Sequence, residues 1–333
     1  MKIKEVQVYK TELKLKEPFR IAPGASILSR NVIVKILTDE NIVGIGEGSP
    51  SKRVCNETVE TNIEFIKAIS KDILNLNIFN LEKLREIFSK YPGNPSAKTA
   101  FETAVLDIIG KVTGQPIYKL LGGYRNFIET DITLSIKSPE EMAKDAIKAV
   151  EKGFRILKVK LGVNPVEDVE RIKKIREAVG DKVKIRIDAN EGWDRESALW
   201  VLDKISEYNI EFCEQPLPAH DLEGLKMLKR EEIMPIMADE SMHSLADLLK
   251  LIEEDAVDYV NIKLMKCGGL TAAVDIAHTA ETVGVKCMIG CMGESLVGIT
   301  AGVHVAQALR NIVFYDLDAD LFLAEKLVKR GGA

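Results

Sequence analysis

Three carboxylates follow apolar stretches of the chain at nearly equal intervals. Asp188, Glu214 and Asp239 each end a short run typical of a buried strand, and they lie about one strand–helix unit apart. Three successive parallel strands would therefore bring one carboxylate each to the same edge of a sheet. Oxygen ligands on rigid strand ends suit a hard divalent cation, and Mg²⁺ leaves positions open for substrate. A single carboxylate in such a position could simply cap the helix that follows it. Helix capping is a poor explanation for three carboxylates spaced one unit apart.

Three lysines occupy similar apolar runs on either side of this trio. Lys158 and Lys160 are two residues apart in the run 156–161, so on a strand they point to the same face. Lys263 lies in the run 259–264, one strand after the trio, whereas Lys160 comes one strand before it. In a closed barrel these two strands stand on opposite walls. Simple neutralisation of the carboxylates would not explain that placement.

Two amines facing each other across a bound cation suit a narrow kind of chemistry. A proton beside a carboxylate is hard to remove, because the product is a dianion that needs a metal to stabilise it as an enediolate. Lys160 could remove the proton from one face and Lys263 could return one to the other, which inverts the carbon. A lysine base needs a pKa of about 7–8, and we expect Lys158 and the metal to help lower it.

Another pair of carboxylates ends the last apolar run. Asp316 and Asp318 share a face of an extended segment, and no lysine lies within three residues of them. Such a pair at a barrel mouth could bind a substrate ammonium group, although an ordinary loop turn also fits the spacing.

The second part of the chain has the rhythm of a barrel. Ser138 and Glu141 form a capping-box pattern around Pro139, and Asn164 before Pro165 repeats the signal for a helix start. Short apolar runs alternate with such helices, which predicts a parallel (β/α)8 TIM barrel, with a doubly wound open sheet as the alternative. The eighth repeat looks short, with only a helix-like tail over 321–329. The eight candidate strands are 131–136, 156–161, 184–188, 210–214, 235–238, 258–263, 286–290 and 312–316.

The first part of the chain differs and predicts an α+β capping domain over residues 1–125, before a barrel domain over 126–333. Its opening alternates like strands, glycines at 44, 46 and 48 interrupt the next run, and helical periodicity covers 57–113. We expect a sheet followed by a helical hairpin, with loops at 17–30 and 48–56 closing over the substrate.

Composition excludes several classes of protein. The net charge of −5 argues against a nucleic-acid surface, and no apolar stretch is long enough to span a membrane. The charged start lacks a signal-peptide core, which predicts a cytoplasmic location. Five scattered cysteines form no disulfide pattern. The sequence leaves the oligomeric state open, with a homo-oligomer as one option.

Over nearly the whole chain these residues resemble the enolase superfamily, in the muconate-lactonizing-enzyme subgroup, whose sites combine Lys or His bases with Mg²⁺. The resemblance implies one Mg²⁺ per active site, held by the three carboxylates. It also implies that Lys160 and Lys263 are the acid/base catalysts and that Lys158 assists. The matching motifs are Lys158-Val-Lys160, Asp188-Ala-Asn190, Glu214-Gln-Pro216, Ala238-Asp239-Glu240-Ser241 and Asn261-Ile-Lys263-Leu-Met-Lys-Cys-Gly-Gly269.

Within the subgroup the chain looks most similar to the dipeptide epimerases. Asp316-Leu-Asp318 matches the pair that binds the dipeptide ammonium group in that family, and the stretch 288–295 matches as well. The resemblance implies inversion of the second residue's α-carbon in L-Ala-L-X dipeptides. Further substrate-binding residues that it implies are Ser135, Gly24, Ile27, Cys291, Met292 and Glu294.

Two features depart from the pattern of that family. Epimerases that act on Ala-Glu carry an arginine in the capping loop, where this chain has Gly24, so a hydrophobic or aromatic X fits better than Glu. Relatives usually continue past the position of Ala333 with a segment that returns to the cap, which puts cap stability in question. Alternatives are o-succinylbenzoate synthase or a muconate-type cycloisomerase on the same fold, and a non-catalytic binding protein.

Overall fold

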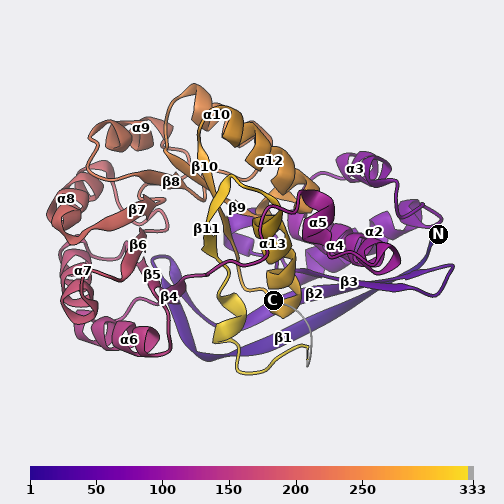
Figure 1. Cartoon of the computed structure of the whole chain (residues 1–333), viewed down its shortest axis with the longest axis horizontal. Coiled ribbons are helices and arrows are strands. Elements are labelled where there is room, and N and C mark those ends of the chain that lie inside the picture. Colours follow the sequence, from indigo (N-terminus) through magenta and orange to yellow (C-terminus); the bar gives the residue numbers. More distant parts are fainter. Residues whose placement is uncertain (329–333) are drawn as a thin grey trace.

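The computed structural model describes residues 1–328 and begins with an antiparallel three-stranded sheet (Figure 1). Its strands β1 (Ile3–Ile21), β2 (Gly24–Thr38) and β3 (Val43–Gly48) pair in chain order. Three longer helices and two short ones then replace the single helical hairpin that the sequence predicted. The helices are α1 (Lys52–Cys55), α2 (Val59–Ile73), α3 (Leu81–Ser89), α4 (Pro95–Thr113) and α5 (Ile117–Leu121).

Strand β3 lies directly against the backbone of α4. A Cβ atom added to Gly46 would be 2.0 Å from the Ala100 carbonyl oxygen, and one added to Gly44 would be 1.9 Å from that of Ala104. Only glycine permits so close an approach of two backbones. The glycines that interrupt the sequence pattern therefore continue the strand and fix the position of α4 on the sheet.

The rest of the chain forms an eight-stranded parallel sheet, so the predicted fold class is confirmed. The strands pair in the order β11-β10-β9-β8-β7-β6-β5-β4, which is the order of a barrel wall. They are β4 (Ile132–Leu134), β5 (Ile156–Lys160), β6 (Lys184–Asp188), β7 (Ile210–Glu214), β8 (Ile236–Ala238), β9 (Tyr259–Lys263), β10 (Lys286–Gly290) and β11 (Ile312–Asp316). The connecting helices are α6 (Pro139–Glu151), α7 (Pro165–Val179), α8 (Arg195–Ile205), α9 (Leu222–Arg230), α10 (Leu245–Glu253), α11 (Leu264–Cys267), α12 (Leu270–Thr282) and α13 (Leu296–Ala308).

Local signals start these helices where the sequence predicted. Ser138 accepts a hydrogen bond from the Glu141 amide at the start of α6, and the Glu141 side chain accepts one in return, completing the capping box. Asn164 accepts from two amides at the start of α7. These caps satisfy amides that have no partner within the helix.

Few contacts join the first and last strands of the parallel sheet. Within residues 1–328 no ladder pairs β4 with β11. The Asp131 amide donates to the Tyr315 carbonyl at 3.3 Å, and the buried Arg186 guanidinium binds both the Asp131 carboxylate and the Tyr315 carbonyl. The sheet is thus brought round into a barrel with a weakly joined seam.

The predicted helical tail is wrong where the structure describes it. After β11 the chain forms a short 3-10 helix, Ala319–Phe322, and then runs back to β1. Leu323 bridges Leu15, and the Ala324 amide donates to the Lys14 carbonyl at 2.8 Å. Pairing with an existing strand supplies backbone partners that an isolated final helix would not gain. Position 329, the end of the predicted tail, lies outside the described residues.

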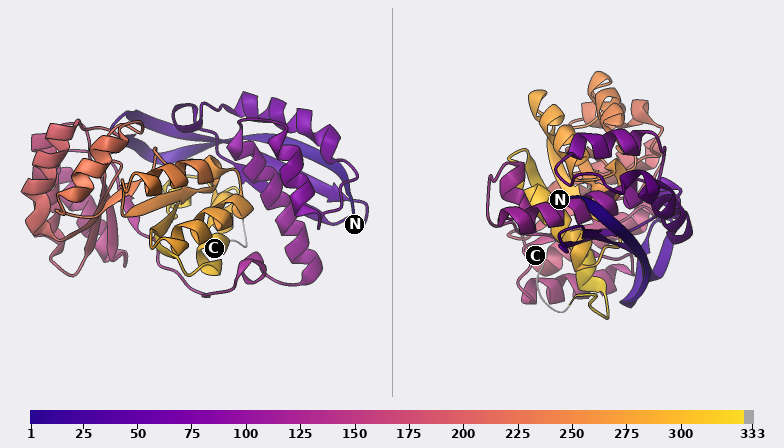
Figure 2. Two further views of the ribbon diagram at one scale, coloured as in Figure 1. Left: turned by 90° about the horizontal axis from the view of Figure 1, so that it is seen from above. Right: turned by 90° about the vertical axis from the view of Figure 1, so that its right-hand side faces the viewer.

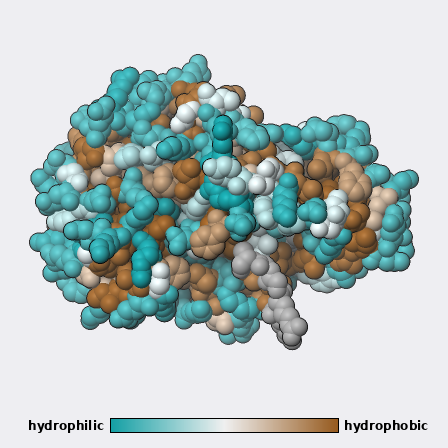
Figure 3. All heavy atoms as spheres, viewed as in Figure 1, coloured by the Kyte–Doolittle hydropathy of each residue, from teal (hydrophilic) through white to brown (hydrophobic). Residues whose placement is uncertain are grey.

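The long β1–β2 hairpin reaches from the N-terminal helices back along the barrel (Figure 2). The face shown in Figure 3 is mostly hydrophilic, with small scattered hydrophobic groups. Among the described residues, no helix has both the length and the apolar character needed to cross a bilayer.

Candidate active site

Three carboxylates meet at the carboxyl ends of adjacent barrel strands. Asp188 ends β6, Glu214 ends β7, and Asp239 directly follows β8. All three are buried, and each offers an oxygen within 4.8 Å of those of the other two. Carboxylate oxygens at this spacing can hold a hard divalent cation such as Mg²⁺.

Lys158 lies at the centre of the buried charges. Its ammonium group is 2.7 Å from Glu214, 2.7 Å from Asp316 and 3.2 Å from Asp188, and the side chain is 1% exposed. One cation therefore links the carboxylate trio to the carboxylate that ends β11. No lysine lies near Asp316 in the sequence, but the fold brings Lys158 next to it.

The other two predicted lysines approach the trio from different strands. Lys160, the last residue of β5, donates to the Asp188 carboxylate and, at 3.1 Å, to the Asn190 side chain. Lys263, the last residue of β9, donates to the Asp239 carboxylate at 2.8 Å. Three strands separate β5 from β9 along the sheet, and the remaining three separate them the other way. The two amines thus stand on opposite sides of one carboxylate cluster.

A fourth lysine of the cluster was not predicted from the sequence. Lys266 follows Lys263 by three residues, and its buried ammonium group contacts the Asp239 carboxylate and lies 3.2 Å from the Asn261 carbonyl. The single turn of α11 folds it back toward the strand ends. Ion pairs of the cluster thus join four carboxylates to four ammonium groups. In the sequence, only the three-residue spacing from Lys263 could have indicated Lys266.

Charge is unevenly neutralised within the trio. Burial alone would raise the pKa of Asp239, but Lys263 and Lys266 hold it well below its usual range. Burial and the neighbouring Asp188 raise the pKa of Glu214 to about 7. Burial would lower the pKa of Lys263, yet Asp239 raises it, contrary to the lowered pKa expected of a lysine base. Asp239 pairs with two ammonium groups, whereas Glu214 pairs with Lys158, which also pairs with two other carboxylates, so the donor set and its electrostatics both fit a metal cation.

The carboxylates after β11 form a second acidic group beside the first. Asp316, Asp318 and Cys291 place ligand atoms within 4.8 Å of one another. Burial and Asp316 raise the pKa of Asp318 to about 7, although the Thr133 amide donates to it at 2.6 Å. Lys158 pairs with Asp316, whereas no ion pair among residues 1–328 involves Asp318, so Asp318 is the member available to a bound cation.

Comparisons with known proteins agree with this geometry. The model of the mandelate racemase / muconate lactonizing enzyme N-terminal domain matches residues 3–122, and that of the enolase C-terminal domain-like family matches 141–332. The chain belongs to the enolase superfamily. This confirms the resemblance drawn from its motifs.

Its relatives in the superfamily include several enzymes that act on amino-acid derivatives. The chain is 44% identical over 333 residues to the hydrophobic dipeptide epimerase of Enterococcus faecalis, covering 99% of this chain and 94% of that protein. A crystal structure of the dipeptide epimerase from that organism, complexed with Mg and L-Leu-L-Tyr, matches with a TM-score of 0.98, 44% identity and coverage of 100% and 94%. The substrate-liganded L-Ala-D/L-Glu epimerase from Bacillus subtilis matches with a TM-score of 0.96, 37% identity and coverage of 100% and 95%.

The N-terminal hairpin of this superfamily member closes against the barrel mouth. A Cβ atom added to Gly162, just after β5, would lie 3.1 Å from the Ala22 side chain at the hairpin turn. Gly24 follows that turn with open space beside its Cα, and Ile27 on β2 is 63% exposed. The hairpin tip thus lies against the residues that follow β5, and two of the predicted substrate-binding positions come shortly after it in the chain.

The remaining predicted contacts are divided between two places. Met292 and Glu294 lie in the loop after β10, where the Met292 amide donates to the buried Glu294 carboxylate. Ser135 directly follows β4, next to the end of β5, and its hydroxyl accepts from the Arg20 amide and donates to the Arg20 carbonyl. Its observed partner is thus the hairpin backbone.

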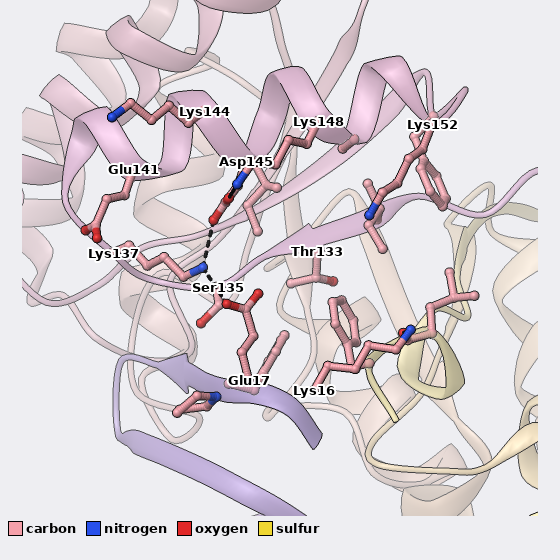
Figure 4. Close-up of a pocket in the computed structure, with 18 residues that line it drawn as sticks. Lys16, Glu17, Thr133, Ser135, Lys137, Glu141, Lys144, Asp145, Lys148 and Lys152 are labelled. Atoms are coloured by element: carbon pink, nitrogen blue, oxygen red, sulfur yellow. Dashed lines mark hydrogen bonds and ion pairs between the residues drawn. The ribbon is translucent and has the colours of Figure 1, made fainter. Parts of the chain in front are cut away.

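A cavity of about 660 Å³ lies outside the barrel wall, between α6, β4 and β1 (Figure 4). Ser135 lines it, and Lys137 spans it by pairing with Glu17 and Asp145. The lysines and carboxylates of the cluster are not among the described residues that line this space. Leu321 and Phe322, in the 3-10 helix after β11, also line this cavity, which is separate from the carboxylate cluster.

Proposed function

We propose that the chain is a Mg²⁺-dependent dipeptide epimerase, an isomerase that inverts the α-carbon of the C-terminal residue in dipeptides of the L-Ala-L-X type. The observation that carries this proposal is the placement of Lys160 and Lys263 on opposite sides of one buried carboxylate cluster. Inversion needs a proton to leave one face of a carbon and another to arrive at the opposite face. The dipeptide epimerase from Enterococcus faecalis supports the substrate class.

Each lysine would serve one face of the substrate carbon. In one direction Lys160 removes the α-proton and the Lys263 ammonium delivers one to the other face, and in the reverse direction they exchange roles. Asp318, with Asp316, would bind the substrate ammonium group and so orient the dipeptide between the amines. Lys158 would hold the ends of β6, β7 and β11 at fixed positions by its three ion pairs.

Asp188, Glu214 and Asp239 would hold one Mg²⁺. When bound, the metal supplies positive charge near the substrate carboxylate, which lowers the energy of the enediolate form of the substrate. The buried cluster and the cap above it exclude water, which strengthens these charge interactions.

The structure of the hairpin supports a hydrophobic or aromatic X. Gly24 offers no charge to an acidic side chain, and Ile27 presents an exposed apolar surface on the adjoining strand. The hydrophobic dipeptide epimerase named among the relatives fits the same preference.

Deuterium incorporation at the α-carbon tests the proposal. The protein with Mg²⁺ in D₂O should exchange and epimerise L-Ala-L-Phe or a similar dipeptide, followed by mass shift and by chiral separation. Lys160→Ala and Lys263→Ala should each abolish epimerisation, while each retains exchange from one epimer only. If no dipeptide in a library shows exchange, epimerisation is refuted. One-way loss of water would favour o-succinylbenzoate synthase, and one-way ring closure would favour a muconate-type cycloisomerase. Unchanged properties of both lysine variants would favour a binding protein.

Three further predictions accompany the proposal without a test in the structure. We propose a boundary between cap and barrel near residue 125. The cytoplasmic location and the homo-oligomer remain predictions from the sequence, which cell fractionation and light scattering would check.

A further inference from the structure

The connection that follows Lys263 depends on the cap for its hydrogen bonds. Helix α12 begins after Gly269, which has no side chain to cap the free amides of its first turn. Glu102, from cap helix α4, takes that place. Its carboxylate accepts from the Thr271 amide at 3.2 Å and from the Thr271 hydroxyl.

Glu102 and the start of α12 pack tightly against each other. Glu102 is 2% exposed, and a Cβ atom added to Gly269 would lie 2.0 Å from its carboxylate oxygen. One turn earlier on α4, the buried Thr99 hydroxyl lies 2.7 Å from the Leu264 carbonyl. Helix α4 therefore contacts the connection at both ends, next to Lys263 and at the first turn of α12.

The connection that follows Lys160 has a different support. Asp168, on barrel helix α7, accepts from the Gly162 amide at 3.0 Å and from the Trp193 indole at 3.0 Å. Its other carboxylate oxygen accepts from Arg171. A buried carboxylate thus holds the connection after each lysine, but one comes from the barrel and the other from the cap.

We propose that Glu102 and Thr99 are positioning residues for Lys263, so that a buried cap carboxylate supports the half-reaction on one face of the substrate, whereas a buried barrel carboxylate, Asp168, supports the half-reaction on the other. This inference rests on the proposed two-lysine epimerisation. A shift of about 1 Å in a reacting group can lower a rate by about 100-fold. Loosening one connection should therefore impair one lysine and spare the other.

The test compares α-proton exchange in D₂O from each epimer separately, with the full chain and Mg²⁺. Lys263→Ala defines which epimer needs Lys263 for exchange. Glu102→Gln should lower exchange of that epimer by about tenfold to 100-fold, while exchange of the other epimer stays within about twofold. Asp168→Asn is the matched variant and should give the opposite pattern. A purely structural role would lower both exchange rates together.

The outcomes separate this inference from the function on which it rests. Equal losses for the two epimers in Glu102→Gln, or no loss, would overturn the inference and leave the epimerase intact. If Glu102→Gln does not fold, Thr99→Val must show the same one-sided loss, and its absence overturns the inference. A wild-type chain that exchanges neither epimer of any dipeptide overturns both.

Discussion

Replacing Lys158 by Met should make the protein less stable without metal and yet improve its affinity for Mg²⁺. Lys158 is 1% exposed and pairs with Asp188, Glu214 and Asp316. Methionine fills nearly the same volume without charge. The cluster would then hold four carboxylates against three ammonium groups, and its unpaired negative charge would favour a divalent cation.

The size of both effects follows from the burial of the ion pairs. Removing one partner of a buried pair costs about 3–5 kcal/mol, because it leaves the other charge uncompensated. Two unit charges 4 Å apart interact by about 4 kcal/mol at an effective dielectric constant of 20. Lys158→Met removes the repulsion between the Lys158 ammonium group and the metal. If that repulsion is only a third of this interaction energy, its removal would tighten Mg²⁺ binding about tenfold.

Thermal unfolding in EDTA and across a Mg²⁺ titration measures both effects. A ligand stabilises the folded state by RT ln(1 + [L]/Kd), so the rise in Tm with Mg²⁺ should be larger in Lys158→Met than in the wild type. Lys137→Met is the control, because Lys137 pairs with Glu17 and Asp145 away from the cluster. A Mg²⁺-dependent rise in Lys158→Met that is equal to or smaller than that of the wild type would refute the reasoning.

Three other changes test the cap, the hairpin and the loop after β10. Gly46→Ala puts a methyl group 2.0 Å from the Ala100 carbonyl oxygen and should cost about 1–3 kcal/mol in thermal unfolding, while Ile45→Ala, on the 40% exposed opposite face, should cost far less. Gly24→Arg should raise the ratio of kcat/KM for Ala-Glu over Ala-Phe by about tenfold through a charge-assisted hydrogen bond, and an unchanged ratio would count against a role for this position. Burial raises the pKa of Glu294 to about 8 in the folded protein. The folded state therefore holds this proton more tightly than the unfolded state, which stabilises the protein at low pH. That stability is lost as the pH rises from about 4.5 through 8. Glu294→Gln should remove that decline, worth up to about 5 kcal/mol, and a parallel pH–stability curve in the variant would contradict it.

Much of the barrel could be predicted because its units repeat. Asp188, Glu214 and Asp239 stand one strand–helix unit apart in the sequence, and parallel strands convert equal spacing into a common edge. The family resemblance then assigned them to a metal. Roles for individual site residues remain predictions that the proposed variants address.

The parts that could not be predicted depend on contacts between distant segments. Glu102 looks like an ordinary helix residue, and its partner Thr271 is 169 residues away. Lys266 reaches Asp239 only because one turn of helix follows β9, which strand periodicity cannot reveal. The tail after β11 has helical spacing, but pairing with Leu15 and its neighbours overrides that local preference.

The direct packing of the β3 backbone against the α4 backbone limits how this protein could acquire new substrates. Two backbones in direct contact have no side chains through which the distance could be adjusted in small steps. The frame that carries Glu102 is therefore fixed, whereas the hairpin turn at 22–24 projects from it with open space around Gly24. Exchange of hairpin tips among relatives would accordingly alter which dipeptide is accepted and leave the proton-transfer machinery unmoved.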